Sequence, residues 1–136
     1  MNKPRARVLI VDDSAMVRAL HAYILQTVGF DTIEAENGFT ALEMLRQWHC
    51  DVAVVDMNMP RMDGLTLIKR IRAERDTKDL PVIIVSVEQD VRNQRLGIEA
   101  GANVYVVKPT EPAQLVSHVQ LLIGTSSLAD SRAPNG

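Results

Sequence analysis

The chain has 136 residues, of which 24% are charged and 46% hydrophobic, and its formal net charge is −2 at pH 7. This length suits one domain with a sizeable core. The Lys and Arg residues are scattered along the chain and form no basic cluster that would indicate a nucleic acid partner. Cys50 is the only cysteine, so no intrachain disulfide can form, and the apolar runs are too short for a signal peptide or a membrane span. We therefore expect a cytoplasmic protein whose partners include neither nucleic acid nor membrane.

Short runs rich in valine and isoleucine alternate along the chain with longer helical patterns. The predicted strands are residues 8–11, 32–35, 52–55, 82–85 and 104–107. Four of these five runs are almost continuously apolar, which is typical of strands buried on both faces of a parallel sheet. The second run, TIEA, is weaker.

A helical pattern follows each predicted strand. The first has an apolar stripe of Val17, Leu20, Ile24 and Val28, whereas the fourth, at about 91–100, is poorer and contains Gly97. Apolar residues also mark the other three patterns: Leu42 and Leu45; Leu65, Leu67, Ile68 and Ile71; Leu115, Val119, Leu122 and Ile123.

Five strand–helix units in succession predict an α/β domain, with a doubly wound, five-stranded parallel sheet and five helices covering both faces. We place this domain at residues 1–124. The stretch after Gly124 consists mainly of small and polar residues, so residues 125–136 are predicted to be a flexible C-terminal tail.

In such a sheet, ligands bind beyond the carboxyl ends of the strands. Three carboxylates, one hydroxyl and one ammonium group are delivered to this rim, from Asp12, Asp13, Asp56, Ser86 and Lys108. Because three neighbouring carboxylates repel one another, we expect an oxygen-seeking cation, and a site with few protein ligands and retained waters suits Mg²⁺. The backbone carbonyl of Asn58 is expected to be a further ligand.

The same cluster has the charges that phosphoryl transfer requires. Asp56 is expected to be the nucleophile, forming an acyl phosphate whose oxygens are shared among Mg²⁺, Lys108 and the Ser86 hydroxyl. As an alternative, Asp12 and Asp13 could serve only to cap the first helix. Capping does not explain why Asp56 and Lys108 reach the same rim.

The motifs LIVDDS, VVDMNMPRMDGL, VIIVS and AGANVYVVKP together resemble the response-regulator receiver domain, in its CheY-like form, from about Val8 to Ile123. This resemblance implies the strand order 2-1-3-4-5 and phosphorylation of Asp56 by a histidine kinase. It also implies that Asp12 and Asp13 form the acidic metal pair, that Ser86 is the switch hydroxyl, and that Lys108 binds the phosphoryl group.

The resemblance further implies how the signal is passed on and ended. Tyr105 stands at the aromatic switch position, the Lys108-Pro109 bond is expected to be cis, and a downstream protein target would bind the face of the fourth helix, fifth strand and fifth helix. Asn58 and Glu88 resemble the pair that flanks the path of the hydrolytic water in rapidly reset chemotaxis regulators. Val87 replaces a usually smaller residue, so we expect it to crowd the phosphoryl site.

Three classes of function remain. A phosphorylation switch would catalyse only its own phosphoryl transfer and autodephosphorylation, and would not be an enzyme acting on other substrates. A phosphohydrolase of the haloacid dehalogenase type is disfavoured because residue 58 is Asn rather than an acid and the acidic pair precedes the nucleophile. A degenerate receiver that only binds partners is disfavoured by the complete set of site residues. The switch is our prediction, as a single-domain regulator in preference to the front of a larger protein.

Overall fold

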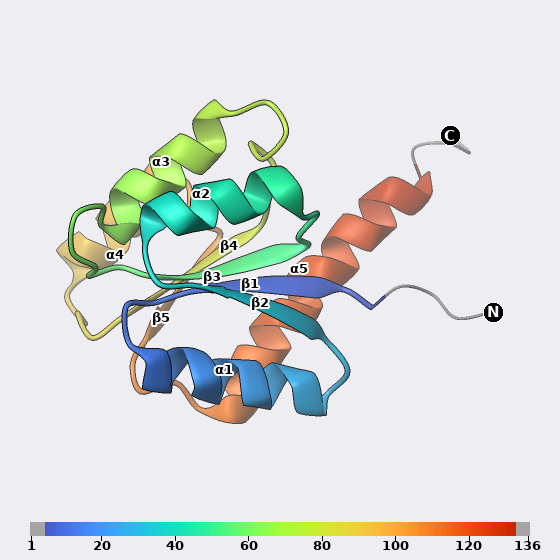
Figure 1. The fold of residues 1–136 in the computed structure, drawn as a ribbon, viewed down its shortest axis with the longest axis horizontal. Helices are drawn as coiled ribbons and strands as arrows, with labels where there is room; N and C mark the ends of the chain where they lie inside the picture. The colour runs from blue at the N-terminus through green and yellow to red at the C-terminus, as the bar shows by residue number, and fades with distance from the viewer. Residues whose placement is uncertain (1–4, 133–136) are drawn as a thin grey trace.

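The computed structural model describes the backbone of residues 5–132 and the side chains of residues 5–124. Strands and helices alternate along the whole of this range (Figure 1). The strands are β1 (Arg7–Val11), β2 (Asp31–Ala35), β3 (Val52–Asp56), β4 (Val82–Ser86) and β5 (Val104–Val107). The helices are α1 (Ala15–Thr27), α2 (Gly38–Gln47), α3 (Gly64–Ala73), α4 (Val91–Ala100) and α5 (Pro112–Arg132).

The strands form one parallel sheet in the order β2-β1-β3-β4-β5. In Figure 1, α1 and α5 cover one face of this sheet, and α2, α3 and α4 cover the other. The doubly wound fold and the strand order are therefore confirmed. The predicted strands also match in position, with each boundary within one residue of the observed one.

Alternate residues of the central strands belong to two separate cores. On β1, Leu9 and Val11 pack into the core beneath α2 and α3, while Val8 and Ile10 pack into the core beneath α1 and α5. Every residue of β3 and β4 is buried. Burial on both faces explains why these strands read as continuous apolar runs rather than alternating patterns.

The apolar stripe predicted for α1 is partly wrong. Leu20 and Val28 are exposed, at 54% and 47%, whereas His21 and Ala22 take buried positions beside Ile24. Val28 is the C-cap of a helix that ends at Thr27, so it does not continue the helical face. The buried face of α1 is made by His21, Ala22, Ile24 and Leu25, and because alanine and histidine carry little apolar signal, the sequence pattern did not show that this face is centred there.

The last helix, α5, continues past Gly124 into the stretch predicted to be a tail, and it ends at Arg132. The segment TSSLADSR contains neither Pro nor Gly, and Gly124 within a helix is unfavourable by only about 1 kcal/mol. The flexibility of residues 125–136 stays a prediction, and residues 133–136 lie outside the described part of the chain. None of the helices in the described range has the length and hydrophobicity of a membrane span.

The side chain of Arg72 ties the end of α3 to two other segments. Its guanidinium donates to the carbonyl of Gly101 from Nε at 3.1 Å and from Nη2 at 2.8 Å. It also donates to the carbonyls of Lys78 and Leu80 and to the side-chain oxygen of Asn103. Gly101 has φ +120° and is the C-cap of α4, so Arg72 stabilises the turn that leads from α4 into β5.

Replacing this guanidinium should weaken the fold. The Arg72→Met variant keeps the aliphatic stem but removes all five hydrogen bonds, and we expect the free energy of unfolding to fall by about 2 to 4 kcal/mol. Urea unfolding followed by circular dichroism measures this change. Arg70→Met, on the exposed side of the same helix, is the control and should stay within about 0.5 kcal/mol of the parent. Equal stability of the two variants would contradict the role of Arg72.

Candidate functional site

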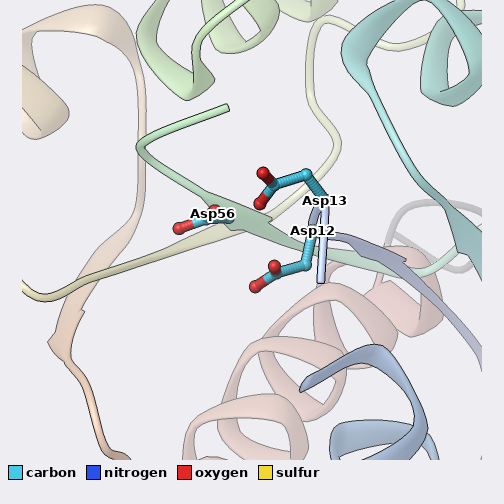
Figure 2. Close-up of side chains that lie close together, drawn as sticks. All are labelled: Asp12, Asp13 and Asp56. Atoms are coloured by element: carbon cyan, nitrogen blue, oxygen red, sulfur yellow. The ribbon is translucent and has the colours of Figure 1, made fainter. Parts of the chain in front are cut away.

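The carboxylates of Asp12, Asp13 and Asp56 meet at the carboxyl edge of the sheet. Asp12 and Asp13 follow β1 and Asp56 ends β3, and these strands pair in parallel with Val11 opposite Val55. Figure 2 shows the three side chains close together, and one oxygen from each lies within 4.8 Å of the others. Asp12 and Asp56 are buried, while Asp13 is exposed.

The Lys108 side chain reaches into this cluster from the loop after β5. Its Nζ donates to Asp12 Oδ2 at 2.9 Å and to Asp56 Oδ1 at 3.0 Å. Burial lowers the pKa of Lys108, but the hydrogen bonds to the two carboxylates outweigh burial and raise it overall. Lys108 is therefore held as a cation. The peptide bond between Lys108 and Pro109 is cis.

The pKa of Asp56 is raised, mainly because its carboxylate is buried, and repulsion by Asp12 adds to this rise. The hydrogen bond and the charge of Lys108, together with a hydrogen bond from the backbone of Asn58, act in the opposite direction without cancelling it. Among the described residues, Lys108 is the one cation in contact with this cluster, and it contacts two of the three carboxylates. Asp13 opens the cluster to solvent, and a set of carboxylate oxygens around such an opening fits a hard divalent cation such as Mg²⁺.

Hydrogen bonds hold Asp12 in place, and a different residue caps the N-terminus of α1. Asp12 Oδ1 accepts from the Ser14 backbone N–H at 2.9 Å, and Arg18 Nη1 donates to the Asp12 carbonyl at 2.6 Å. The N-cap of α1 is Ser14, whose hydroxyl accepts from the Val17 N–H at 3.2 Å. Capping by Asp12 or Asp13 is therefore not what brings these carboxylates to the rim.

The loop after β3 folds back tightly on Asp56. The Gly64 N–H donates to the Met57 carbonyl at 2.8 Å, and a Cβ at Gly64 would collide with the carbonyl oxygen of Asp56. Asp63 is the N-cap of α3, accepting from the Thr66 N–H at 2.8 Å, so its role is structural. Asn58, in the same loop, is exposed.

Ser86 and Tyr105 are joined through the backbone of Glu88. Ser86 is completely buried, and its hydroxyl accepts from the Glu88 N–H at 3.0 Å. The Tyr105 hydroxyl donates to the Glu88 carbonyl at 2.8 Å. The two side chains that the sequence assigned to the switch are therefore linked in space, next to Val87, which is 61% exposed.

Sequence reasoning missed the part that Met57 plays in this group. Its sulfur lies 3.5 Å from the Ser86 hydroxyl and 3.8 Å from the Tyr105 hydroxyl. Met57 is buried directly after Asp56, where an apolar side chain is expected for packing alone. The sequence therefore holds no signal that would distinguish it from the neighbouring Met59.

Comparisons with known proteins agree with this geometry. Residues 8–120 match the family model described as the response regulator receiver domain. The chain is 41% identical over 110 residues to the chemotaxis protein CheY-3 of Vibrio cholerae, covering 80% of this chain and 85% of that protein. It is 32% identical over 127 residues to the phosphate regulon transcriptional regulatory protein PhoB of Pseudomonas aeruginosa, covering 93% of this chain and 56% of that protein.

A similar solved structure is that of a putative response regulator from Chloroflexus aurantiacus, with a TM-score of 0.85 and 34% sequence identity. The match covers 89% of this chain and 99% of that one. Family model, sequence relatives and structural neighbour all point to one family, and the structural neighbour has the fold described above. The chain belongs to the response regulator receiver domains, the CheY-like domains of two-component signalling.

Proposed function

We propose that this protein is a phosphorylation-activated signalling switch in which Asp56 accepts a phosphoryl group from a histidine kinase. Receiver domains take phosphoryl groups from histidine kinases and act on downstream targets. The observation that carries the proposal for this chain is the position of Lys108, which donates to both Asp12 and Asp56 within the three-carboxylate cluster. In this arrangement Lys108 favours the ionised form of Asp56 against the effect of burial, and it places a cation where the charge of a phosphoryl group would develop.

In the transfer step, a carboxylate oxygen of Asp56 forms a bond to phosphorus while the bond from phosphorus to the donor's imidazole nitrogen breaks. The imidazole, protonated on its other ring nitrogen, leaves as a neutral group, and Asp56 becomes an acyl phosphate. Lys108 can then exchange its hydrogen bonds to carboxylates for hydrogen bonds to phosphoryl oxygens. Mg²⁺ held by Asp12, Asp13, Asp56 and the Asn58 carbonyl would supply the remaining positive charge.

Incubation of the protein with acetyl phosphate and Mg²⁺ should add one phosphoryl group, detected by intact-mass spectrometry and removed by hydroxylamine. Asp56→Asn should not be labelled, because the nucleophile is gone, and a chelator should prevent labelling of the parent. Asp63→Asn is a matched control, since it removes one charge outside the cluster and keeps a capping residue on α3. Undiminished labelling of Asp56→Asn, or of the parent in chelator, would show that the site is assigned wrongly.

The structure also supports the proposed output face of α4, β5 and α5. A Cβ at Gly97 would lie 3.0 Å from the Tyr105 ring, so α4 rests directly on the switch side chain. Gly97 and Ala100 are the only residues that α4 buries, while Val91 and Ile98 are exposed. A helix with so little buried apolar surface is weakly tied to the core, as a switching element must be.

Binding of beryllofluoride, a mimic of the phosphoryl group, should change amide hydrogen exchange on this face. A hydroxyl of Ser86 that turns to the phosphoryl group would release the Glu88 N–H, and the contact from Glu88 to Tyr105 would rearrange with it. We expect altered protection within residues 86–110 and unchanged protection in α2, as measured by mass spectrometry. Equal protection of residues 86–110 in the free and bound protein would mean that the output surface lies elsewhere.

We further propose that Val87 and Glu88 tune the lifetime of the signal. Glu88 is exposed, like Asn58, and polar side chains at these positions can orient the water that attacks the phosphorus. Val87 directly follows Ser86 and is largely exposed, so it contacts the solvent from which that water must come. Its methyl groups oppose the polar pair by hindering approach to phosphorus. A barrier change of about 1.4 kcal/mol alters a rate tenfold, so this hindrance can outweigh water orientation.

The Val87→Ala variant should therefore be phosphorylated by acetyl phosphate and dephosphorylated faster than the parent. We expect both rates to rise by roughly two- to tenfold. Incorporation of radiolabelled phosphate from acetyl phosphate measures the first rate, and its loss measures the second. Val91→Ala makes the same change at an exposed residue of α4 and should leave both rates unaltered. Decay that is unchanged or slower in Val87→Ala would show that Val87 does not hinder the site.

A further inference from the structure

The sulfur of Met57 lies between the two hydroxyl groups assigned to the switch. We propose that Met57 is a positioning residue, which holds the Ser86 hydroxyl in the resting state and thereby sets how readily the switch turns on. This inference rests on the proposed function, because it concerns the same Ser86 that would bind the phosphoryl group. It assigns a role to a side chain that neither the site motifs nor metal binding explains.

The sulfur of Met57 accepts the hydrogen bond that the Ser86 hydroxyl donates. The Ser86 hydroxyl has one proton to donate, and its oxygen already accepts from the Glu88 N–H at 3.0 Å. Among the hydrogen bonds of the described residues, the Met57 sulfur at 3.5 Å is the one acceptor of that proton. The Tyr105 proton goes instead to the Glu88 carbonyl at 2.8 Å, so the 3.8 Å approach of Tyr105 to the sulfur is a packing contact.

The weakness of a thioether as an acceptor matters for switching. Ser86 is completely buried, so its proton needs an acceptor within the protein in the resting state. A thioether sulfur is a weak acceptor, whereas a phosphoryl oxygen carries charge and forms a much stronger hydrogen bond. Met57 therefore satisfies Ser86 at rest and loses the proton readily when the phosphoryl group arrives. A hydrocarbon at this position would leave the resting state unsatisfied, and the active state would be favoured.

The Met57→Leu variant tests this directly, since leucine keeps a similar volume but has no acceptor. We expect beryllofluoride, in the presence of Mg²⁺, to bind this variant roughly two- to fivefold more tightly than the parent, the effect of losing one weak hydrogen bond from the resting state alone. Isothermal titration calorimetry measures the affinity. Binding that is equal to or weaker than the parent's overturns the inference.

Two further variants separate this role from a general loosening of the loop. Met59→Leu changes another buried methionine of the same loop and should leave the affinity unaltered. In a Ser86→Ala background, Met57→Leu should have no effect, because the proton that it deprives of an acceptor is absent. Tighter binding by Met59→Leu, or a persisting effect of Met57→Leu without Ser86, would overturn the inference.

A measurement on the parent keeps the test independent of whether Met57→Leu folds. In protein labelled with ¹³C at the methionine methyl groups, the Met57 signal is identified by its nuclear Overhauser contacts to the Tyr105 ring. This signal should move on beryllofluoride binding and in Ser86→Ala, and the Met59 signal should move much less. A stationary Met57 signal in both cases would overturn the inference. Failure of the parent to bind beryllofluoride at all would instead disprove the proposed function.

Discussion

Electrostatic repulsion among three carboxylates is the constraint on which the functional end of this domain depends. The parallel pairing of β1 with β3 places Asp12 beside Asp56, and burial prevents water from screening the two charges. Lys108 is the one cation that the described residues bring into hydrogen-bond contact with both carboxylates. Because removing either partner of a buried ion pair leaves an uncompensated charge, the ends of β1, β3 and β5 are energetically coupled. Attachment of a doubly charged phosphoryl group to Asp56 would change the charge at the site, and Lys108 would then have to change its contacts with Asp12 and Asp56.

That change can reach the surface through a short series of contacts. Ser86 joins the site to the backbone of Glu88, Glu88 joins Ser86 to Tyr105, and the Tyr105 ring packs on Gly97 of α4. The far end of this series is the weakly buried helix, while the near end is a fully buried strand. We therefore expect a change at Asp56 to move α4 rather than to deform the sheet.

The parts of the fold that were predictable are those with a periodic or local signal. Four almost continuous apolar runs and the weaker run at residues 32–35 predicted the five strands to within one residue, and polar residues at strand ends identified the carboxylate cluster. Arg72 and Met57 were not predictable in their roles. The acceptors of Arg72 lie in turns up to 31 residues away, and the contact of Met57 with Ser86 spans 29 residues. Contacts of this kind follow from the packing of the finished fold, not from local pattern.

Partner choice must reside outside the carboxylate cluster. The chain is similar both to a chemotaxis protein and to a transcriptional regulator, whose names indicate different outputs from one family of domain. The repulsion at the site demands the same charges whatever the output, so the cluster cannot distinguish one target from another. The exposed apolar side chains of α4, including Val91 and Ile98, are under no such constraint. They belong to α4, the helix that the Tyr105 ring contacts. A target that covers them in one position of α4 would bind preferentially to the conformation with α4 in that position.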